Sequence, residues 1–161
     1  MAQISVGEFV VKFDDELAGL MSQFKWSVND YSTSAKAKKY YAATSVAGRA
    51  VYMHRMILDA DRRKDVDHIN GDGLDNRRCN LRLATRSQNC ANKPAMGGSS
   101  KYKGVCAANT KSPRYRAWVM KDKKSIYLGS FKTEAEAAAA YNKAAFEIWG
   151  EFAHLNEIAG N

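Results

Sequence analysis

Residues 66–92, VDHINGDGLDNRRCNLRLATRSQNCAN, are the stretch around which the chain is organised. They open with an acid next to a histidine, Asp67 and His68. The loop after His68 is rich in Asn, Asp and Gly, which favour turns. Residues 80–84 then alternate polar and apolar side chains, as a half-buried strand does. The pattern predicts two strands joined by a turn-rich loop.

A short helix is predicted directly after the second of these strands. Thr85 stands three residues before Gln88, which is the spacing of a capping box. Asn89 falls on the first turn of the expected helix. A strand, a loop, a strand and a helix in this order could gather Asn89 and the polar side chains of both strands into one small site.

The side chains of this stretch suit metal-assisted hydrolysis. Asp67 and Asn89 offer hard oxygen atoms, which bind Mg²⁺ or Mn²⁺ better than Zn²⁺. His68 titrates near neutrality and can act as the general base that activates a water. A calcium loop of the EF-hand type is excluded, because the glycine positions would require a ligand at Val66 or His68. The alternative is that the Asn-, Asp- and Gly-rich loop is only a turn and has no functional role.

The same residues resemble the HNH nuclease family, whose catalytic fold is called ββα-metal. The match is to the asparagine-ended version that is common in phage homing endonucleases. It rests on Asp67 with His68, Asn80 with Leu81 and Arg82, Gln88 with Asn89, and, upstream, Met53 with His54 and Arg55.

This resemblance implies a role for each residue of the site. Asp67 and Asn89 are expected to hold one divalent ion, Mg²⁺ or Mn²⁺, against the scissile phosphate. His68 is expected to be the general base, and Asn80 to orient His68 through a hydrogen bond. The family often has histidine where this chain has Asn89, so the ligand set is weaker in nitrogen donors.

The charge of the chain indicates a polyanionic partner. The 161 residues carry a net charge of +8, and the pI is near 9.4. Residues 97–132 hold nine Lys and Arg against one acid, whereas residues 133–161 hold one lysine against five glutamates. A basic run is often only a solvated face, but this degree of segregation favours nucleic acid.

Composition also sets limits on the class of protein. A hydrophobic content of 45% supports a core, and no run of eighteen apolar residues predicts a membrane span. No secretory signal is visible at the start, so an intracellular location is expected. The three cysteines form no C-x-x-C pair, and neither structural zinc nor a disulfide framework is expected.

The N-terminal segment is expected to form a small strand–helix–strand part. Residues 8–13 (EFVVKF) predict a strand, and Asp14 stands where it can cap the short helix that follows. Trp26 and Val28 indicate a second strand, and residues 38–44 a third. This part is expected to pack against the nuclease motif.

Residues 53–58 predict a short helix that leads into the organising stretch. Its His54 belongs to the family pattern, and we expect it to be structural or to contact phosphate rather than to act as the base. The basic residues Lys36, Lys38 and Lys39 either touch phosphate or are only solvated, and the sequence leaves both readings open.

Four arginines lie within the organising stretch itself, and Arg86 is the last of them. Arg77 and Arg78 stand in the loop, and Arg82 stands on the second strand. Arginines around a nuclease site can position the phosphate backbone of DNA. Surface solubility is the alternative, but their concentration around one loop favours contact with DNA.

The C-terminal part predicts three strands followed by one helix. The first strand is expected to start at Tyr102. The second is expected to cover residues 114–120 and the third residues 125–131. Thr133 and Glu136 have capping-box spacing. The helix is expected to present one face with small side chains toward the sheet, formed by Ala137, Ala140, Tyr141, Ala144 and Ile148.

This part resembles the plant ethylene-response-factor DNA-binding domain, the APETALA-two fold, over residues 101–156. The match consists of the segments YKGV, YLGSF, TEAEAAAAYNKAAF and GEFAHLN. The resemblance implies that the sheet enters the major groove of DNA. Cys106, Ala108 and Met120 stand where plant members carry arginines, so the plant target sequence cannot be carried over.

Strand alternation predicts which side chains face DNA. Val119, Ile126 and Leu128 should face the helix. The outward, DNA-facing set is Lys103, Arg114, Arg116, Trp118 and Tyr127. For Trp118, a packed aromatic side chain is the alternative.

The sequence therefore predicts an α+β protein in two parts. A nuclease unit covers residues 1–92 with its core at 51–92, a linker covers 93–100, and a DNA-binding domain covers 101–161, with a three-stranded antiparallel sheet packed on one helix. The expected function is that of a homing-type, metal-dependent endonuclease acting on double-stranded DNA. The alternative is a non-catalytic DNA-binding regulator that keeps a degenerate nuclease fold. A monomer in the cytoplasm of a bacterial host is expected, with a phage gene as one origin that the resemblance implies.

Overall fold

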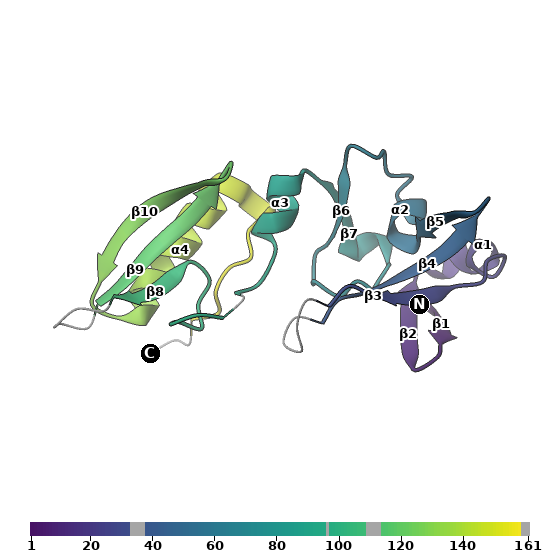
Figure 1. Cartoon of the computed structure of the whole chain (residues 1–161), viewed down its shortest axis with the longest axis horizontal. Helices are drawn as coiled ribbons and strands as arrows, with labels where there is room; N and C mark the ends of the chain where they lie inside the picture. The colour runs from purple at the N-terminus through teal and green to yellow at the C-terminus, as the bar shows by residue number, and fades with distance from the viewer. Residues whose placement is uncertain (33–37, 96, 109–113, 159–161) are drawn as a thin grey trace. The chain divides into compact units, whose positions relative to one another are not determined.

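The computed structural model describes residues 1–32, 38–95, 97–108 and 114–158 (Figure 1). The chain divides into two compact units, residues 1–85 and 86–161. Small antiparallel sheets and short helices make up both units, with one longer helix near the C-terminus, so the fold is of the mixed α and β kind that was expected. The division falls before the linker predicted at residues 93–100. Met96 of that linker lies outside the described residues, and the domain boundaries stay a prediction.

The first unit opens with a β-hairpin. Strand β1 (Ala2–Val6) pairs with β2 (Phe9–Phe13), and Gly7 has a φ of 61° in the turn between them. The sequence predicted β2 but missed β1. The side chains of β1 are exposed or only half-buried, whereas β2 buries Val11 and Phe13 almost completely, so only β2 has a strong apolar signal.

A three-stranded antiparallel sheet follows the hairpin. The turn η1 (Asp15–Leu17) and helix α1 (Ala18–Met21) lead to it. Its strands are β3 (Ser27–Asp30), β4 (Tyr40–Val46) and β5 (Arg49–Tyr52), with β4 in the centre. Helix α2 (Met53–Ile57) comes next, where a short helix was predicted. Strand β5 was not predicted, and Lys36 lies outside the described residues.

The organising stretch forms a strand, a loop and a strand, as predicted. Strand β6 (Asp65–His68) pairs antiparallel with β7 (Leu81–Ala84), so that His68 lies opposite Leu81. The second strand starts at Leu81 rather than at Asn80, because Asn80 ends the 3-10 turn η2 (Arg78–Asn80).

One apolar core joins the hairpin, the sheet, α2 and the β6–β7 pair. Full burial of one large apolar side chain contributes roughly 1.5–3 kcal/mol, so this cluster anchors both strands of the motif. Its buried members are Val11, Phe13, Met21, Ala42, Met53, Ile57, Val66 and Leu81.

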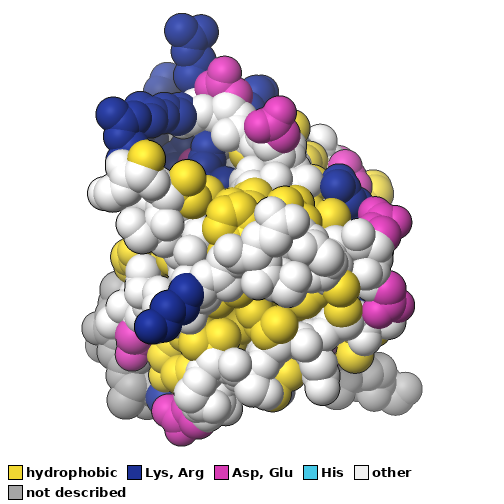
Figure 2. All heavy atoms as spheres, turned by 90° about the vertical axis from the view of Figure 1, so that its right-hand side faces the viewer, with side chains coloured by type: hydrophobic (Ala, Val, Ile, Leu, Met, Phe, Trp, Pro, Cys, Tyr) yellow, Lys and Arg dark blue, Asp and Glu magenta, His cyan; other side chains and the backbone are white. Residues whose placement is uncertain are grey.

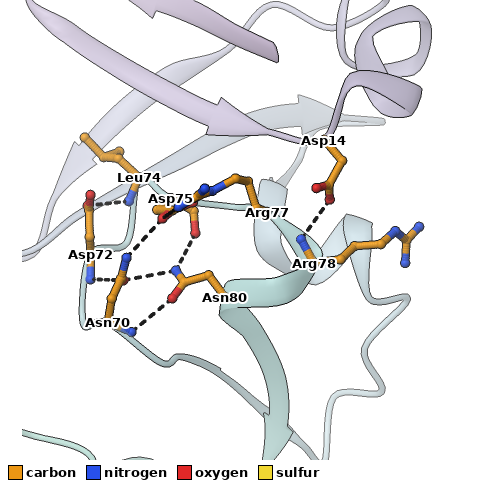
Figure 3. Close-up of polar contacts among 8 residues, drawn as sticks. All are labelled: Asp14, Asn70, Asp72, Leu74, Asp75, Arg77, Arg78 and Asn80. Carbon is orange, nitrogen blue, oxygen red and sulfur yellow. Dashed lines mark hydrogen bonds and ion pairs between the residues drawn. The ribbon is translucent and has the colours of Figure 1, made fainter. Parts of the chain in front are cut away.

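Asp14 ties the hairpin to the motif loop. Its backbone is at the N-terminus of η1, but its side chain makes no capping hydrogen bond there. Instead, the Asp14 carboxylate accepts a hydrogen bond of 2.8 Å from the backbone N–H of Arg78 (Figure 3). The prediction that Asp14 caps the first helix is therefore wrong, because a contact with a residue distant in the chain takes its place.

One face carries patches of apolar side chains among polar ones (Figure 2). Figure 2 shows apolar side chains gathered on the face that lies to the right in Figure 1, with Lys, Arg, Asp and Glu around them. Among the described side chains, no histidine is visible on this face.

No helix within the described part of the chain has both the length and the apolar character that a membrane span requires.

The second unit begins with helix α3 (Arg86–Ala91), directly after Thr85 as predicted. Strands β8 (Val105–Ala108), β9 (Arg114–Lys121) and β10 (Lys124–Phe131) form an antiparallel sheet with β9 in the centre. Helix α4 (Glu134–Trp149) packs on this sheet, and the turn η3 (Gly150–Phe152) follows it. The prediction of a three-stranded antiparallel sheet packed on one helix is confirmed.

The start of α4 is fixed by a complete capping box. The backbone N–H of Glu136 donates to the Thr133 hydroxyl at 3.1 Å, and the backbone N–H of Thr133 donates to the Glu136 carboxylate at 3.2 Å. This pair satisfies two of the N–H groups that a helix start leaves without an intrahelical partner. The predicted capping box is confirmed.

Small side chains let α4 lie close to the sheet. Ala137, Ala138 and Ala145 are fully buried at this contact. Gly104 also belongs to it, because a β-carbon there would lie 2.1 Å from the Tyr141 ring.

The predicted faces of the sheet are largely confirmed. Val119 is buried against α4 and Leu128 packs there. Ile126 pairs with Val119 in register but is 40% exposed, because it lies on the edge strand β10. The predicted outward residues Arg114, Arg116, Trp118 and Tyr127 are all exposed.

Candidate active site

The loop between β6 and β7 is closed by the side chain of Asn80 (Figure 3). The Asn80 amide nitrogen donates to the Asn70 side-chain oxygen at 3.0 Å and to the Asp75 backbone carbonyl at 2.8 Å. The Asn80 amide oxygen accepts from the Asn70 backbone N–H at 3.0 Å. These bonds join the start, the middle and the end of the loop, so the loop returns to β7 in a fixed conformation.

An ion pair of a buried carboxylate supports the same loop. Asp75 is 2% exposed, and its carboxylate accepts from the Arg77 guanidinium at 2.7 and 2.6 Å. The Asn70 amide also donates to Asp75 at 3.0 Å. The hydrogen bond from Arg77 holds the pKa of Asp75 below its usual value. Two charge-assisted bonds of this kind favour one geometry of the loop.

The loop is also joined to the hairpin and to the sheet. The Lys12 backbone on β2 donates to Leu74 at 2.9 Å and accepts from the Asn76 backbone at 2.8 Å. Gly73 lies against β4, where an added β-carbon would be 2.2 Å from the Tyr40 carbonyl oxygen. The backbone of the loop is thus held from both sides.

Asp67 is a buried carboxylate on β6. It is 4% exposed and lies opposite Arg82 in the β6–β7 register. The Arg82 guanidinium donates from Nε at 2.9 Å, and its terminal nitrogen lies 2.8 Å from the same carboxylate oxygen. This ion pair compensates the buried negative charge, which would otherwise be costly.

His68, next to Asp67, is 5% exposed. Its Nε2 lies 3.4 Å from the side-chain oxygen of Asn76, which is fully buried. Burial lowers the pKa of His68, while the hydrogen bond with Asn76 and the charge of Asp67 act in the opposite direction. Because the pKa is lowered, His68 is neutral at pH 7, which is the state a general base needs.

A second buried histidine adjoins His68. His54 on α2 is 8% exposed, and its ring centroid lies 5.1 Å from that of His68, in an edge-to-face arrangement. The rings of Tyr52 and Tyr41 lie 5.5 and 5.2 Å from His54. Burial is the main cause that lowers the pKa of His54 to about 3, with His68 as the next cause. His54 therefore stays neutral at any pH where the enzyme would work.

The structure places three of the four predicted catalytic and metal residues in the first unit. Asp67 and His68 end β6, and Asn80 closes the loop that starts after them. The described side-chain bonds of Asn80 go to Asn70 and Asp75, so Asn80 holds the loop. Asn89 lies on α3 in the second unit, and its pairing with Asp67 stays a prediction.

Sequence reasoning gave no role to Asn76 or to the ring contacts of His54. Asn76 stood in a polar, turn-rich cluster, where a buried asparagine and an exposed one look alike. His54 belonged to the family resemblance, but only the structure shows its ring against His68.

The basic residues predicted to bind DNA have several different environments. Arg77 and Arg82 pair with Asp75 and Asp67, whereas the side chain of Arg78 is exposed and lies 3.5 Å from Glu16. The ammonium group of Lys103 donates to the backbone carbonyls of Ala91 and Lys93, and burial lowers its pKa to about 8. DNA contact by each of these residues stays a prediction, and the described pairing favours Arg78.

The donor set limits the kind of metal that could bind. Among the described residues, no group of three or more His, Cys, Asp and Glu side chains is arranged to hold an ion. A metal at Asp67 would therefore complete its shell with amide, phosphate or water oxygens, as hard divalent ions commonly do.

Comparison with known proteins agrees with this site. The family model described as HNH endonuclease matches residues 59–91, which contain Asp67, His68, Asn80 and Asn89. An HNH endonuclease of Acanthamoeba polyphaga mimivirus is 34% identical over 145 residues, covering 86% of this chain and 70% of the viral protein. No solved structure matches the chain.

A buried histidine beside a buried aspartate, on a strand followed by a closed loop, suits a hydrolytic nuclease. The match with the viral protein extends over most of both chains. The chain belongs to the HNH endonuclease family. The prediction of an HNH-family DNA endonuclease is thereby confirmed. Neither comparison supports the resemblance of residues 101–156 to the APETALA-two fold, which stays a hypothesis.

We predict that His54 makes the stability of the first unit depend on pH. In the unfolded chain His54 is protonated below pH 6.5, the ordinary pKa of histidine. In the folded state His54 stays neutral until the pH falls to about 3, so the unfolded state binds more protons between these values. The contribution of neutral His54 to the free energy of unfolding is complete above pH 6.5. It is lost as the pH falls toward 3, by at most about 1.4 kcal/mol per pH unit. Chemical unfolding of wild type and His54→Gln from about pH 8 to about pH 4 should show a flatter pH dependence for the variant.

His154→Gln is the matched control for this measurement. His154 lies in the second unit and is only half-buried, so its loss should leave the pH dependence of the first unit unchanged. Equal pH dependence in wild type and His54→Gln would contradict the prediction.

Proposed function

We propose that this enzyme is a homing-type endonuclease that hydrolyses a phosphodiester of double-stranded DNA, with His68 as general base and a divalent ion held by Asp67 and Asn89. The observation that carries the proposal is the buried His68 beside the buried Asp67. Family membership and the intact pair both favour catalysis over a regulator with a degenerate nuclease fold.

His68 supplies the proton chemistry of the reaction. A water that attacks the phosphorus loses a proton to the lone pair of the imidazole, and the bond from phosphorus to the 3′ oxygen breaks. The 3′ oxygen leaves with the bonding electron pair and takes a proton from a solvent water. The products are a 5′-phosphate and a 3′-hydroxyl. Proton transfer to a well-placed base contributes typically a hundred- to ten-thousand-fold in rate, and the lowered pKa of His68 keeps the base form available at neutral pH.

The chemistry of the donors fits a hard divalent ion such as Mg²⁺ or Mn²⁺. Asp67 offers a buried carboxylate next to His68, and Asn89 offers an amide oxygen. Such an ion, when bound, stabilises the negative charge that develops on the phosphate and on the leaving oxygen. Arg82 forms an ion pair with Asp67, which compensates the buried negative charge of the carboxylate.

The second unit is proposed to anchor DNA. Its sheet exposes Arg114, Arg116, Trp118 and Tyr127, and the rings of Trp118 and Tyr127 lie 4.6 Å apart across β9 and β10. Arginines beside an aromatic pair can contact phosphates and base edges. The resemblance to the APETALA-two fold and the net charge of residues 97–132 support the same assignment.

We predict that His68→Ala abolishes cleavage and leaves DNA affinity nearly unchanged, because the base acts only in the reaction. The single-turnover rate on plasmid DNA with Mg²⁺ should fall on the order of a hundred- to ten-thousand-fold. Binding without divalent ion should stay at the wild-type level. His154→Ala is the control for loss of a histidine, and cleavage by His68→Ala at near the wild-type rate would refute the role of His68.

We predict that Arg116→Ala weakens binding to duplex DNA without changing the chemical step. A lost phosphate contact should reduce the salt dependence of binding by about one unit of log–log slope at every sequence. A lost base contact should cost roughly 1–3 kcal/mol at the true target and much less at random DNA. Titrations across a salt series, with target and random duplexes, measure both.

Lys143→Ala is the matched control, because Lys143 is an exposed cation on α4, which packs on the sheet. If Arg116→Ala and Lys143→Ala bound DNA with the same affinity and the same salt dependence, the sheet face would not be the DNA anchor.

A further inference from the structure

Asn76 combines full burial with an incomplete set of hydrogen bonds. Its side-chain oxygen lies 3.4 Å from Nε2 of His68, and its side-chain nitrogen has no hydrogen-bond partner among the described residues. Burying an unsatisfied donor costs about 1–3 kcal/mol, so an apolar side chain would serve packing better. An asparagine here is costly for stability, which points to a role in the site.

The backbone of Asn76 is held independently of its side chain. Its N–H donates to the Lys12 carbonyl at 2.8 Å, and the neighbouring Asp75 forms a bridge with Lys12. The preceding N–H, that of Asp75, donates to the Asp72 carbonyl at 3.2 Å. The loop therefore presents the Asn76 amide to His68 in a position set by the hairpin, and changes to the side chain leave these bonds in place.

The chemistry of the contact selects one form of the imidazole. A neutral histidine has one N–H and one lone pair, and the hydrogen bond at one nitrogen decides which nitrogen carries the proton. An amide oxygen only accepts hydrogen bonds, so facing Nε2 it requires the N–H there and leaves the lone pair on Nδ1. The same oxygen still accepts from Nε2–H when the ring is protonated during the reaction.

We propose that Asn76 is the positioning residue of the general base: its amide oxygen fixes His68 in the Nε2–H form, in which the lone pair lies on Nδ1. This rests on the proposed role of His68. It assigns to Asn76 the orienting task that the sequence gave to Asn80, whose described bonds hold the loop instead. Asn76 touches the base rather than the substrate, so it acts through His68.

Two substitutions separate positioning from packing. Asn76→Ala removes the oxygen, and we expect kcat to fall roughly ten- to a hundredfold while KM stays nearly unchanged, the size typical of a lost orienting partner. Asn76→Asp keeps an oxygen that accepts from Nε2, and we expect it to retain most of the wild-type kcat. A purely structural asparagine predicts the opposite order, because a buried carboxylate disturbs packing at least as much as alanine does.

The spectroscopic readout is the tautomer of His68. Nitrogen NMR of full-length protein labelled at histidine, in the absence of DNA and at a pH where His68 is neutral, should show one Nε2–H form in wild type and in Asn76→Asp. Asn76→Ala should show a mixture of both forms. The nitrogen signal that is missing from the spectrum of His68→Ala is assigned to His68. Cys79→Asp, which adds a charge at an exposed position of the same loop, controls for a general effect of charge.

The outcomes distinguish this inference from the proposed function. Cleavage by His68→Ala at the wild-type rate would refute the general base itself. An inactive His68→Ala together with a wild-type kcat for Asn76→Ala would refute only the role of Asn76. The role of Asn76 would also be refuted if Asn76→Asp lost as much kcat as Asn76→Ala. An unchanged tautomer of His68 in Asn76→Ala would refute it as well.

Discussion

The hydrogen bonds of the Asn80 amide are the constraint on which the site depends. They connect both ends of a loop of polar residues and its middle, and they act together with the ion pair of Asp75 and Arg77 and the backbone bonds to Lys12. The loop carries Asp75 and Asn76, and its closure sets where their side chains lie relative to β6. An asparagine suits this place because one side chain both donates twice and accepts. The rigid loop then acts on the neighbouring histidine.

Charge balance explains why a basic protein pairs so many of its site arginines internally. Two buried carboxylates, Asp67 and Asp75, each face one arginine within hydrogen-bond distance. Removing Arg77 or Arg82 would leave a buried carboxylate without its ion-pair partner, which is destabilising. The arginines around the loop thus first compensate buried acids. Contact with the DNA backbone falls in our account to exposed cations, such as those of the β8–β10 sheet.

Much of the fold could be predicted from local patterns. Alternation in residues 80–84 and 114–120 and the capping box at Thr133 depend on neighbours in sequence, and the structure has these strands within one residue of the expected bounds and the capping box where it was expected. Strand β1 was missed because its side chains are too exposed to give a strong pattern. The bond of Asp14 to Arg78 joins residues 64 positions apart, and no local rule indicates it.

The site shows the same division between local and tertiary information. Asp67 and His68 are consecutive in the sequence, and both residues are buried at the end of β6. Which asparagine reaches the imidazole is decided by tertiary contact. Asn76 approaches His68 because Lys12 on β2 fixes its backbone, and Asn80 is occupied because the loop closes on it. The family resemblance assigned the orienting role to Asn80, and no local pattern singled out Asn76.

Chemical rescue is the measurement that tests most directly whether His68 is the general base. His68→Gly leaves a cavity next to Asp67 in which free imidazole can replace the lost ring. We expect added imidazole to restore cleavage in a saturable way, and substituted imidazoles of higher pKa to restore it faster, because a stronger base takes the proton more readily. No rescue of a correctly folded His68→Gly, or rescue rates independent of the pKa of the added base, would contradict the account.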